Sequence, residues 1–549
     1  MVKDINYKRG NIVDLFSART LIFTAFMFLN LILVDLQSSP LRIVQIKIVG
    51  NENCYHDSML ETWEISIRRI IQEVGQRFQA KFGLQLQIKK FCYWQSDKSL
   101  RSTDEYLFNL IKKIPREGCD IVLGIINNNS FRMPFGISSY PHGYILLQNT
   151  KSKSKMKMMF MHELCHLFGA VDLNEEGSIM NIRYPGLRFD QWTARIISLN
   201  LDRNFDQNIF PLSEQKLDDA ISLLKERAGL NRGEAELHLV LASLLFRKGD
   251  DISASIEIQK AMNLNPQLKD LPNYRGVLFQ KQGNIDQAIS EYKKALQFQS
   301  NRPEIHFNLG LAFAEKGRDE AAIEEYQKTL EFDPRVIRAY INLSYLFLKK
   351  GHVNEAIRTC RKALEIQSKS VEVLCSLASA VLFKKMLADE DTDAKHGLTT
   401  AQTRTDQINL VEEAVILGQK ILALKPEQPE AYNILGIAFK FQNETEKAKR
   451  EFKRAIELRP EYLEAHFNLG TLYLEEGILS KAAFHLHKTI EIDPNFADGY
   501  KSLSRILFLE KEYELSRGYQ KKASELREKT RFSSTNLLIL GKKSELERH

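Results

Sequence analysis

The sequence predicts two structural units of different class: an α+β unit near the N-terminus and an all-α superhelical solenoid after it. Strand-like and helix-like segments alternate from residue 41 to about residue 208. From about residue 213 the strand patterns vanish, and helical segments recur with a fixed period. A chain of 549 residues is also longer than one hydrophobic core usually organises.

The composition is that of an ordinary globular protein, with 44% hydrophobic and 27% charged residues. The net charge of +7 is spread along the chain, and no long basic run with interleaved aromatic residues occurs. We therefore expect no nucleic-acid partner. The six cysteines form no C-x-x-C pair, which argues against a zinc ribbon or a thioredoxin-like redox motif.

Residues 1–40 resemble a targeting segment. Basic residues precede an apolar run from Leu21 to Val34, and this run has the length of a signal-peptide core. No A-x-A-like cleavage site follows, so residues 21–34 are expected either to be removed as a signal peptide or to remain as a membrane anchor. The competing interpretation is a buried helix of a cytosolic domain. The first interpretation places the protein outside the cytoplasm, either secreted or membrane-anchored.

The α+β unit is predicted over residues 41–212. Alternating or continuous apolar patterns predict strands at 42–49, 84–93, 120–126 and 143–148. Helical spacing predicts helices at 58–82, 104–114 and 155–168. By the strand order of the family that residues 162–181 resemble, the last predicted strand is expected at the edge of the sheet, just before the helix that carries the candidate site.

The solenoid is predicted over residues 213–530. Glycines recur every 34 residues, at Gly249, Gly283, Gly317 and Gly351. Each period contains two helices, and the second helix carries a small residue followed by a bulky one, such as Ala322 and Tyr326. A polar insertion near 386–409 is expected to form an exposed loop, and residues 531–549 a polar C-terminal tail.

This period and pattern resemble the tetratricopeptide repeat (TPR), with about eight repeats. The resemblance implies a concave groove that binds a protein partner. Asn308, Asn342 and Asn468 occupy one equivalent position, which in such domains can hold a peptide backbone. Asparagine is also common there without a ligand role, so both interpretations stay open.

Residues 162–172 carry the candidate chemistry. His162 and His166 lie one helical turn apart, a spacing that lets two imidazole nitrogens reach one Zn²⁺. Glu163 lies beside the first histidine and is a candidate general base. Gly169 can turn the chain and return Asp172 toward the metal as a third ligand. Three protein ligands leave a fourth position open, as catalytic zinc requires.

The pattern H-E-x-x-H-x-x-G-x-x-D resembles the metzincin zinc peptidases, with Asp172 where most members have histidine, as in snapalysin-type members. Gly177-Ser178-Ile179-Met180-Asn181 resembles the family's Met-turn, which implies that Met180 forms an apolar floor below the zinc. Glu175 and Glu176 are weaker candidates for the third ligand. Cys165 is expected to be a packing residue.

The resemblance implies a zinc-dependent endopeptidase whose repeats recruit a protein substrate or partner. The alternative is a protein-interaction scaffold in which the zinc domain is inactive or structural. Intact Glu163 favours the first hypothesis. The sequence leaves the substrate and the partner undetermined.

Overall fold

The structure is a computed structural model. It describes residues 42–51, 60–97, 100, 103–126, 136–139, 143–150, 152–168, 170, 180, 189–199, 214–230, 234–394 and 401–529. The predictions for residues 1–40, Asp172 and residues 531–549 lie outside the described residues. Across the described ranges, no helix is both long and apolar enough to cross a membrane.

The chain divides into two compact units, Met1–Tyr274 and Arg275–His549, which we call unit 1 and unit 2. The predicted boundary between residues 212 and 213 lies inside unit 1. It marks the place where strand patterns end in the sequence, and as a domain boundary it stays a prediction.

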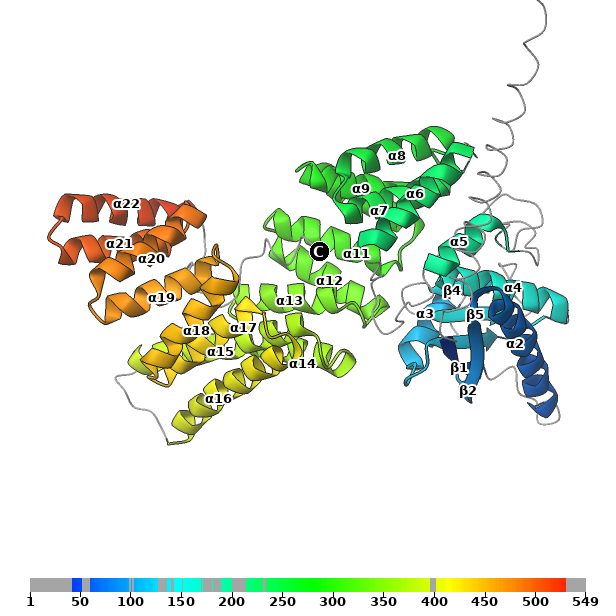
Figure 1. The fold of residues 1–549 in the computed structure, drawn as a ribbon, viewed down its shortest axis with the longest axis horizontal. Helices are drawn as coiled ribbons and strands as arrows, with labels where there is room; N and C mark the ends of the chain where they lie inside the picture. The colour runs from blue at the N-terminus through cyan, green and yellow to red at the C-terminus, as the bar shows by residue number, and fades with distance from the viewer. Residues whose placement is uncertain are drawn as a thin grey trace, which may run out of the picture. The chain divides into compact units, whose positions relative to one another are not determined.

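Unit 1 contains a five-stranded sheet (Figure 1), and hydrogen bonding gives the strand order β2-β1-β3-β5-β4. The strands are β1 (Arg42–Asn51), β2 (Leu84–Trp94), β3 (Ile121–Ile126), β4 (Gly136–Ser139) and β5 (Tyr144–Gln148). Neighbouring strands are parallel, except that β4 pairs with β5 in the antiparallel sense. The four predicted strands are β1, β2, β3 and β5.

Strand β4 corrects the predicted place of β5. Residues 143–148 are predicted at the sheet edge, but Ile145 pairs with Leu123 on one side and with Ser138 on the other. That prediction is wrong, because β4 occupies the edge. Strand β4 is too short and too polar for an alternating pattern to indicate it.

Helices cover both faces of the sheet. They are α2 (Leu60–Phe82), α3 (Thr103–Lys113) and α4 (Lys153–Leu167). Ile121, Leu123 and Ile125 share a core with α2 and α4, whereas Val122 and Ile126 share a core with α3. The alternation follows from the two-residue period of a strand, and it fixes α4 against one face.

Unit 1 continues with α5 (Gln191–Leu199) and a set of helices that lead toward unit 2. These are α6 (Glu214–Leu230), α7 (Ala235–Lys248), α8 (Asp251–Leu264) and the beginning of α9 (Leu271–Lys281). Helix α6 contacts both α5 and α7. The α+β part and the first helices of the solenoid therefore form one compact body.

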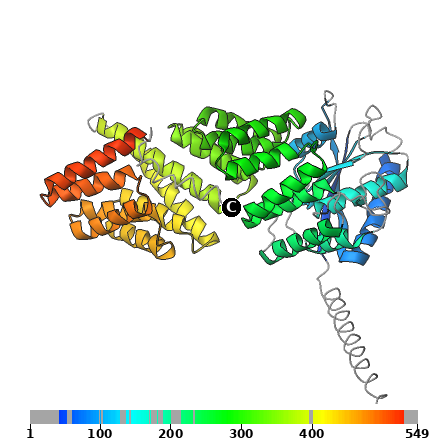
Figure 2. The same ribbon diagram turned by 90° about the horizontal axis from the view of Figure 1, so that it is seen from above.

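The described part of unit 2 consists of helices that pair one after another (Figure 2). Helices α10 to α15 are Ile285–Phe298, Pro303–Glu315, Asp319–Phe332, Ile337–Lys349, Val353–Ile366 and Val371–Ala394. Helices α16 to α22 are Ala401–Leu424, Pro429–Phe441, Thr445–Leu458, Leu463–Glu475, Leu479–Ile492, Ala497–Leu509 and Tyr513–Lys529. The predicted solenoid is thus all-α.

Left-handed backbone turns join the two helices of seven described pairs, α7/α8, α9/α10, α11/α12, α13/α14, α17/α18, α19/α20 and α21/α22. Gly249, Gly283, Gly317 and Gly351 have φ between 74° and 81°, as their 34-residue spacing predicts. At the equivalent places in later repeats, Asn443 and Lys511 have φ of 61° and 67°. The backbone conformation is therefore conserved along the solenoid even where glycine is not.

The predicted exposed loop at 386–409 is wrong in its described part. Helix α15 runs to Ala394 and α16 begins at Ala401, so the insertion lengthens two helices. Most residues of the segment Met386–Ala394 are alanine, leucine, methionine or charged. Composition alone does not argue against a helix here, because alanine, leucine, methionine and glutamate are good helix formers.

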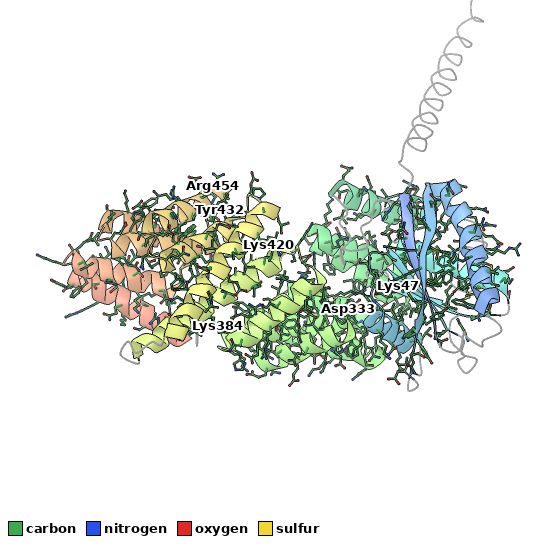
Figure 3. All side chains as sticks on the ribbon, turned by 90° about the horizontal axis from the view of Figure 1, so that it is seen from below. Lys47, Asp333, Lys384, Lys420, Tyr432 and Arg454 are labelled. Carbon is green, nitrogen blue, oxygen red and sulfur yellow. The ribbon has the colours of Figure 1, made fainter. Side chains whose placement is uncertain are left out.

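Figure 3 labels two buried charged residues, Lys47 and Asp333. Their polar partners offset the free-energy cost of burying a charge. Lys47 of β1 donates to the carbonyl oxygen of Pro115 at 2.7 Å and lies 3.3 Å from a carboxylate oxygen of Glu117. Asp333 follows α12, where its Oδ1 accepts from the backbone N–H of Arg335 at 3.1 Å. The aspartate thereby closes the turn between two repeats.

Candidate metal centre

Helix α4 presents the predicted site from the core of unit 1. Ser152 caps its first turn, where the hydroxyl oxygen accepts from the backbone N–H of Lys155 at 3.3 Å. Phe160, Met161 and Leu164 are fully buried against the sheet. The burial of this face sets the rotation of the helix and holds His162 and His166 on a partly exposed side.

The two histidines converge as the sequence predicts. Their Nε2 atoms lie 3.1 Å apart, and the ring planes are nearly perpendicular at 88°. Two nitrogens that each lie about 2.0–2.1 Å from one tetrahedral zinc are separated by about 3.3 Å. The observed separation is close to that of two imidazole ligands around one metal, and it also lies in the range of a hydrogen bond between the two rings.

The outer nitrogen of His166 has its own partner. Its Nδ1 lies 2.9 Å from the carbonyl oxygen of Ala170, which can only accept a hydrogen bond. The proton therefore belongs on Nδ1, and Nε2 keeps its lone pair toward His162. Such a second hydrogen bond is the usual way in which a protein orients a metal-binding imidazole.

The described residues supply only part of the predicted ligand set. No three His, Cys, Asp or Glu side chains among them come together as a metal-binding group. The predicted third ligand, Asp172, lies outside the described ranges, as do Glu175 and Glu176. His162 and His166 thus fit two positions of a zinc site, and the third position stays a prediction.

Glu163 and Cys165 occupy different surroundings from the histidines. Glu163 is buried, with 8% of its surface exposed. Cys165 lies in the core and is fully buried, which agrees with a packing role. Burial raises the pKa of its thiol well above the usual value, and Asp190 and Glu163 act in the same direction. The thiol is therefore a poor nucleophile.

Met180 lies in the hydrophobic core that also contains Phe160, Met161 and Leu164 of α4. It is fully buried. Its neighbours in sequence lie outside the described ranges, so the role of Met180 as the floor of a metal site stays a prediction.

Two residues that shape this region, Ala170 and Asp190, are not among the predicted site residues. Ala170 donates its N–H to the carbonyl oxygen of Cys165 at 3.1 Å and faces His166 with its own carbonyl. Asp190 caps α5, where it accepts from the N–H groups of Trp192 and Thr193 at 3.0 and 2.8 Å. The segment Asp-x-x-Thr before an apolar helix is a signal that could have indicated the cap. An alanine carries no such signal.

A separate groove lies in unit 2. Its volume is about 860 Å³, and Asn468, Lys501 and Arg505 are among its lining residues. Asn468 donates to Oδ1 of Asn433 at 2.9 Å. Of the three predicted asparagines, only Asn468 lines this groove. Asn342 lies 3.4 Å from the hydroxyl of Tyr326, and Asn308 lies on α11.

Comparisons with known proteins identify the repeats. A TPR family model matches residues 276–317, 310–351 and 438–477, and a second tetratricopeptide model matches residues 337–370. Unit 2 therefore contains tetratricopeptide repeats, as predicted, and such repeats imply a protein partner. The family matches do not extend to the α+β part of unit 1. A search of curated proteins found no match.

Two of the solved structures similar to this chain are tetratricopeptide repeat proteins. A thermophilic TPR protein in Thermus thermophilus is 21% identical, covers 38% of this chain and all of its own, and has a TM-score of 0.32. A tetratricopeptide repeat protein from Parabacteroides merdae is 16% identical, covers 53% of this chain and 98% of its own, and has a TM-score of 0.39. Both scores are below 0.5, so neither similarity carries an argument about function.

Proposed function

We propose that this chain is a protein-binding repeat scaffold joined to a zinc-dependent endopeptidase in unit 1. The scaffold part is supported by the family matches to the repeats. The peptidase part is supported by one observation, the convergence of the Nε2 atoms of His162 and His166 at 3.1 Å. The motif that continues through Asp172 adds to this support.

The residues of unit 1 have distinct roles in this proposal. His162, His166 and Asp172 would hold the zinc, which when bound would supply a Lewis acid for a scissile carbonyl. Glu163 would take a proton from the attacking water and deliver it to the leaving amine. Met180 would close the apolar side of the site.

Strand β4 is the better candidate for holding an extended substrate. It lies at the edge of the described sheet and contacts α4, which carries both histidines. An edge strand can pair with an extended peptide through main-chain hydrogen bonds. Residues 143–148 pair with strands on both sides and have no free edge for this role.

The groove of unit 2 would bind the protein that is to be cleaved or held. Lys501 and Arg505 are exposed and one turn apart on α21, so they favour an acidic segment of the partner. The variant with Lys501→Glu and Arg505→Glu should cleave a short peptide as the wild type does and cleave a cognate protein more slowly. Equal cleavage of the cognate protein would contradict recruitment through this groove.

The alternative function is an interaction scaffold whose zinc domain is inactive or structural. The comparisons favour this alternative over the peptidase, since every family match falls on the repeats. It predicts a chain that binds zinc and a partner and hydrolyses no peptide.

One experiment separates the two functions. Zinc content and hydrolysis of casein and short peptides are measured for the full-length protein, for Glu163→Ala and for a control, Glu236→Ala, at an exposed position of α7. The peptidase proposal expects about one zinc per chain in all three proteins. It expects hydrolysis to fall by about 10²-fold or more in Glu163→Ala alone. A wild-type protein that binds zinc and cleaves nothing would favour the scaffold.

The same measurements test the third ligand. Asp172→Ala should lose zinc, whereas Asp172→His should keep it, because histidine is the commoner ligand at this place in the metzincins. Glu175→Ala and Glu176→Ala should both keep zinc. Zinc retention by Asp172→Ala would move the assignment to one of these glutamates.

A further inference from the structure

The first helices of the solenoid pack beside the segment that orients His166. Ala170 is 5% exposed and lies with its neighbours around one small cavity. That cavity is lined by Ala170, Trp192, Thr193, Ile196, Leu223, Leu224, Arg227 and Leu237. We call this set the Ala170 seat. Apart from Ala170, its members come from α5, α6 and α7, so residues of three helices line this cavity together with Ala170.

A buried ion pair holds α6 to the start of α7 at this place. Arg227 of α6 lies 2.9 Å from Glu234, which immediately precedes α7, and their side chains are only 9% and 5% exposed. The guanidinium of Arg227 also lies 5.9 Å from the ring centre of Trp192 on α5. Such a buried pair is costly to break one partner at a time. The seat is therefore fixed by directional contacts in addition to apolar packing.

The backbone of Ala170 connects the seat to the histidine. Its N–H donates to Cys165 at the end of α4, and its carbonyl lies 2.9 Å from Nδ1 of His166. Ala170 lines a cavity together with residues of α5, α6 and α7, while its carbonyl oxygen sets the orientation of the imidazole. A change in the packing of the seat would thus displace the acceptor that orients Nε2 of His166.

We propose that α6 and α7 are a structural part of the metal centre. They hold the Ala170 carbonyl, and through it the His166 imidazole, in the orientation that binds the metal. Leu224 and Leu237 are positioning residues in this arrangement. The inference rests on the proposed function, since it presumes that His162 and His166 bind zinc.

The inference changes the role of the early repeats. The repeats from residue 213 onward are predicted to recruit a substrate or partner. In the proposed arrangement α6 and α7 support the active site, and recruitment belongs to the groove of unit 2. A partner that repacked α6 against α5 would change metal affinity without touching the metal ligands.

The test compares zinc affinity in full-length variants by competition with a chromophoric chelator. Leu224→Ala and Leu237→Ala should bind zinc about 10-fold to 100-fold more weakly than the wild type. The visible absorption of bound Co²⁺ should weaken in parallel. Ile258→Ala is the matched control, because Ile258 is 3% exposed on α8 and lies outside the seat. It should lower stability and leave zinc affinity unchanged.

The outcomes distinguish the inference from the proposed function. If the wild type binds zinc and the seat variants bind it as tightly as Ile258→Ala does, the inference is wrong and the zinc site stands. If the wild type binds no zinc, both are wrong. Leu224→Val removes less volume and keeps the comparison available should Leu224→Ala not fold.

Discussion

Gly310 of α11 lies directly against the ring of Tyr326 of α12. A methyl group at Gly310 would lie 2.7 Å from Cε1 of this tyrosine, which is 1% exposed. The same close approach joins Gly276 to Tyr292 and Gly436 to Phe452. A missing side chain on one helix thus makes room for an aromatic ring on the next.

We therefore predict that Gly310→Ala destabilises unit 2 even though alanine is the better helix former. Overpacking against Tyr326 should cost about 1–3 kcal/mol, more than the roughly 1 kcal/mol that helix propensity returns. Urea denaturation of the full chain, followed by hydrogen exchange of α11 and α12 peptides, measures the change.

Gly518→Ala is the control, and it should change the stability in the opposite direction. Gly518 is exposed on α22, and nothing lies within 4 Å of a methyl group placed there. The substitution should raise stability by about 0.5–1 kcal/mol. Equal effects at the two glycines would contradict the packing argument.

A second prediction concerns the strained turn at Lys511, where φ is 67°. A left-handed conformation costs a residue with a Cβ atom about 1–2 kcal/mol, and glycine at the equivalent Gly477 has no such cost. Lys511→Gly should therefore stabilise the last helix pair, by about 1 kcal/mol after the greater entropy of unfolded glycine is counted. Hydrogen exchange of α21 and α22 peptides in urea measures the change in stability of this helix pair.

Asn443→Gly provides the comparison. Asparagine tolerates the left-handed region better than lysine does, so this substitution should have the smaller effect. A larger gain at Asn443 than at Lys511 would show that backbone strain is not the cause.

These elements show why sequence reasoning found some features and missed others. The strands with alternating patterns, β1 and β2, and the continuous apolar strand β3 carry their own local signal. Strand β4 has four residues, and only its pairing with β5 defines it. Lys511 is equivalent to Gly477 by the 34-residue spacing, but lysine as a residue type does not indicate positive φ. Only the period of the repeat indicates the left-handed conformation at position 511.

The candidate site divides in the same way. The spacing of His162 and His166 predicts their convergence because one helix carries both. The part played by Ala170 depends on residues from three helices that lie far along the chain. The residue at position 170 gives no indication of that contact, because alanine has no functional group.

A third prediction concerns pH. His466 and His485 face each other across α19 and α20 with their Nδ1 atoms 3.0 Å apart, and Nε2 of His466 donates to the carbonyl oxygen of Pro460. Burial lowers the pKa of His485 to about 4, with further contributions from His466 and Lys453. The folded protein therefore favours neutral His485, whereas the unfolded chain takes up the proton near pH 6.5.

The direction in which pH changes the stability follows from the number of protons that the folded and unfolded states bind. Between about pH 6.5 and pH 4 the unfolded state binds more protons, so stability falls as the pH falls. We expect a loss of roughly 1–3 kcal/mol between pH 7 and pH 4, measured by hydrogen exchange of α19 and α20 peptides in urea.

His485→Glu tests the origin of this effect. It would recreate the histidine–glutamate pair that joins His306 to Glu325 at 2.6 Å. A carboxylate partner would raise the pKa of His466, so the pair would gain strength as the pH falls through the histidine range. Stability of this helix pair should then hold or rise toward pH 5. An unchanged acid loss in the variant would exclude the histidine pair as its source.

The last prediction concerns removal of zinc. A ligand that binds only the folded state stabilises it in proportion to the logarithm of its concentration, by about 4 kcal/mol at 1,000 times the dissociation constant. If His162 and His166 hold zinc, chelation should accelerate hydrogen exchange in α4 and in the sheet that packs on it, and added zinc should restore protection. Helices α19 and α20 belong to unit 2 and provide the internal control, because their exchange should not change. The variant His162→Ala should behave like the chelated wild type, with or without added zinc, whereas His487→Ala, at an exposed position of α20, should respond as the wild type does. Protection of α4 that is the same with and without chelator in the wild type would mean that the converging histidines do not hold zinc in the folded protein.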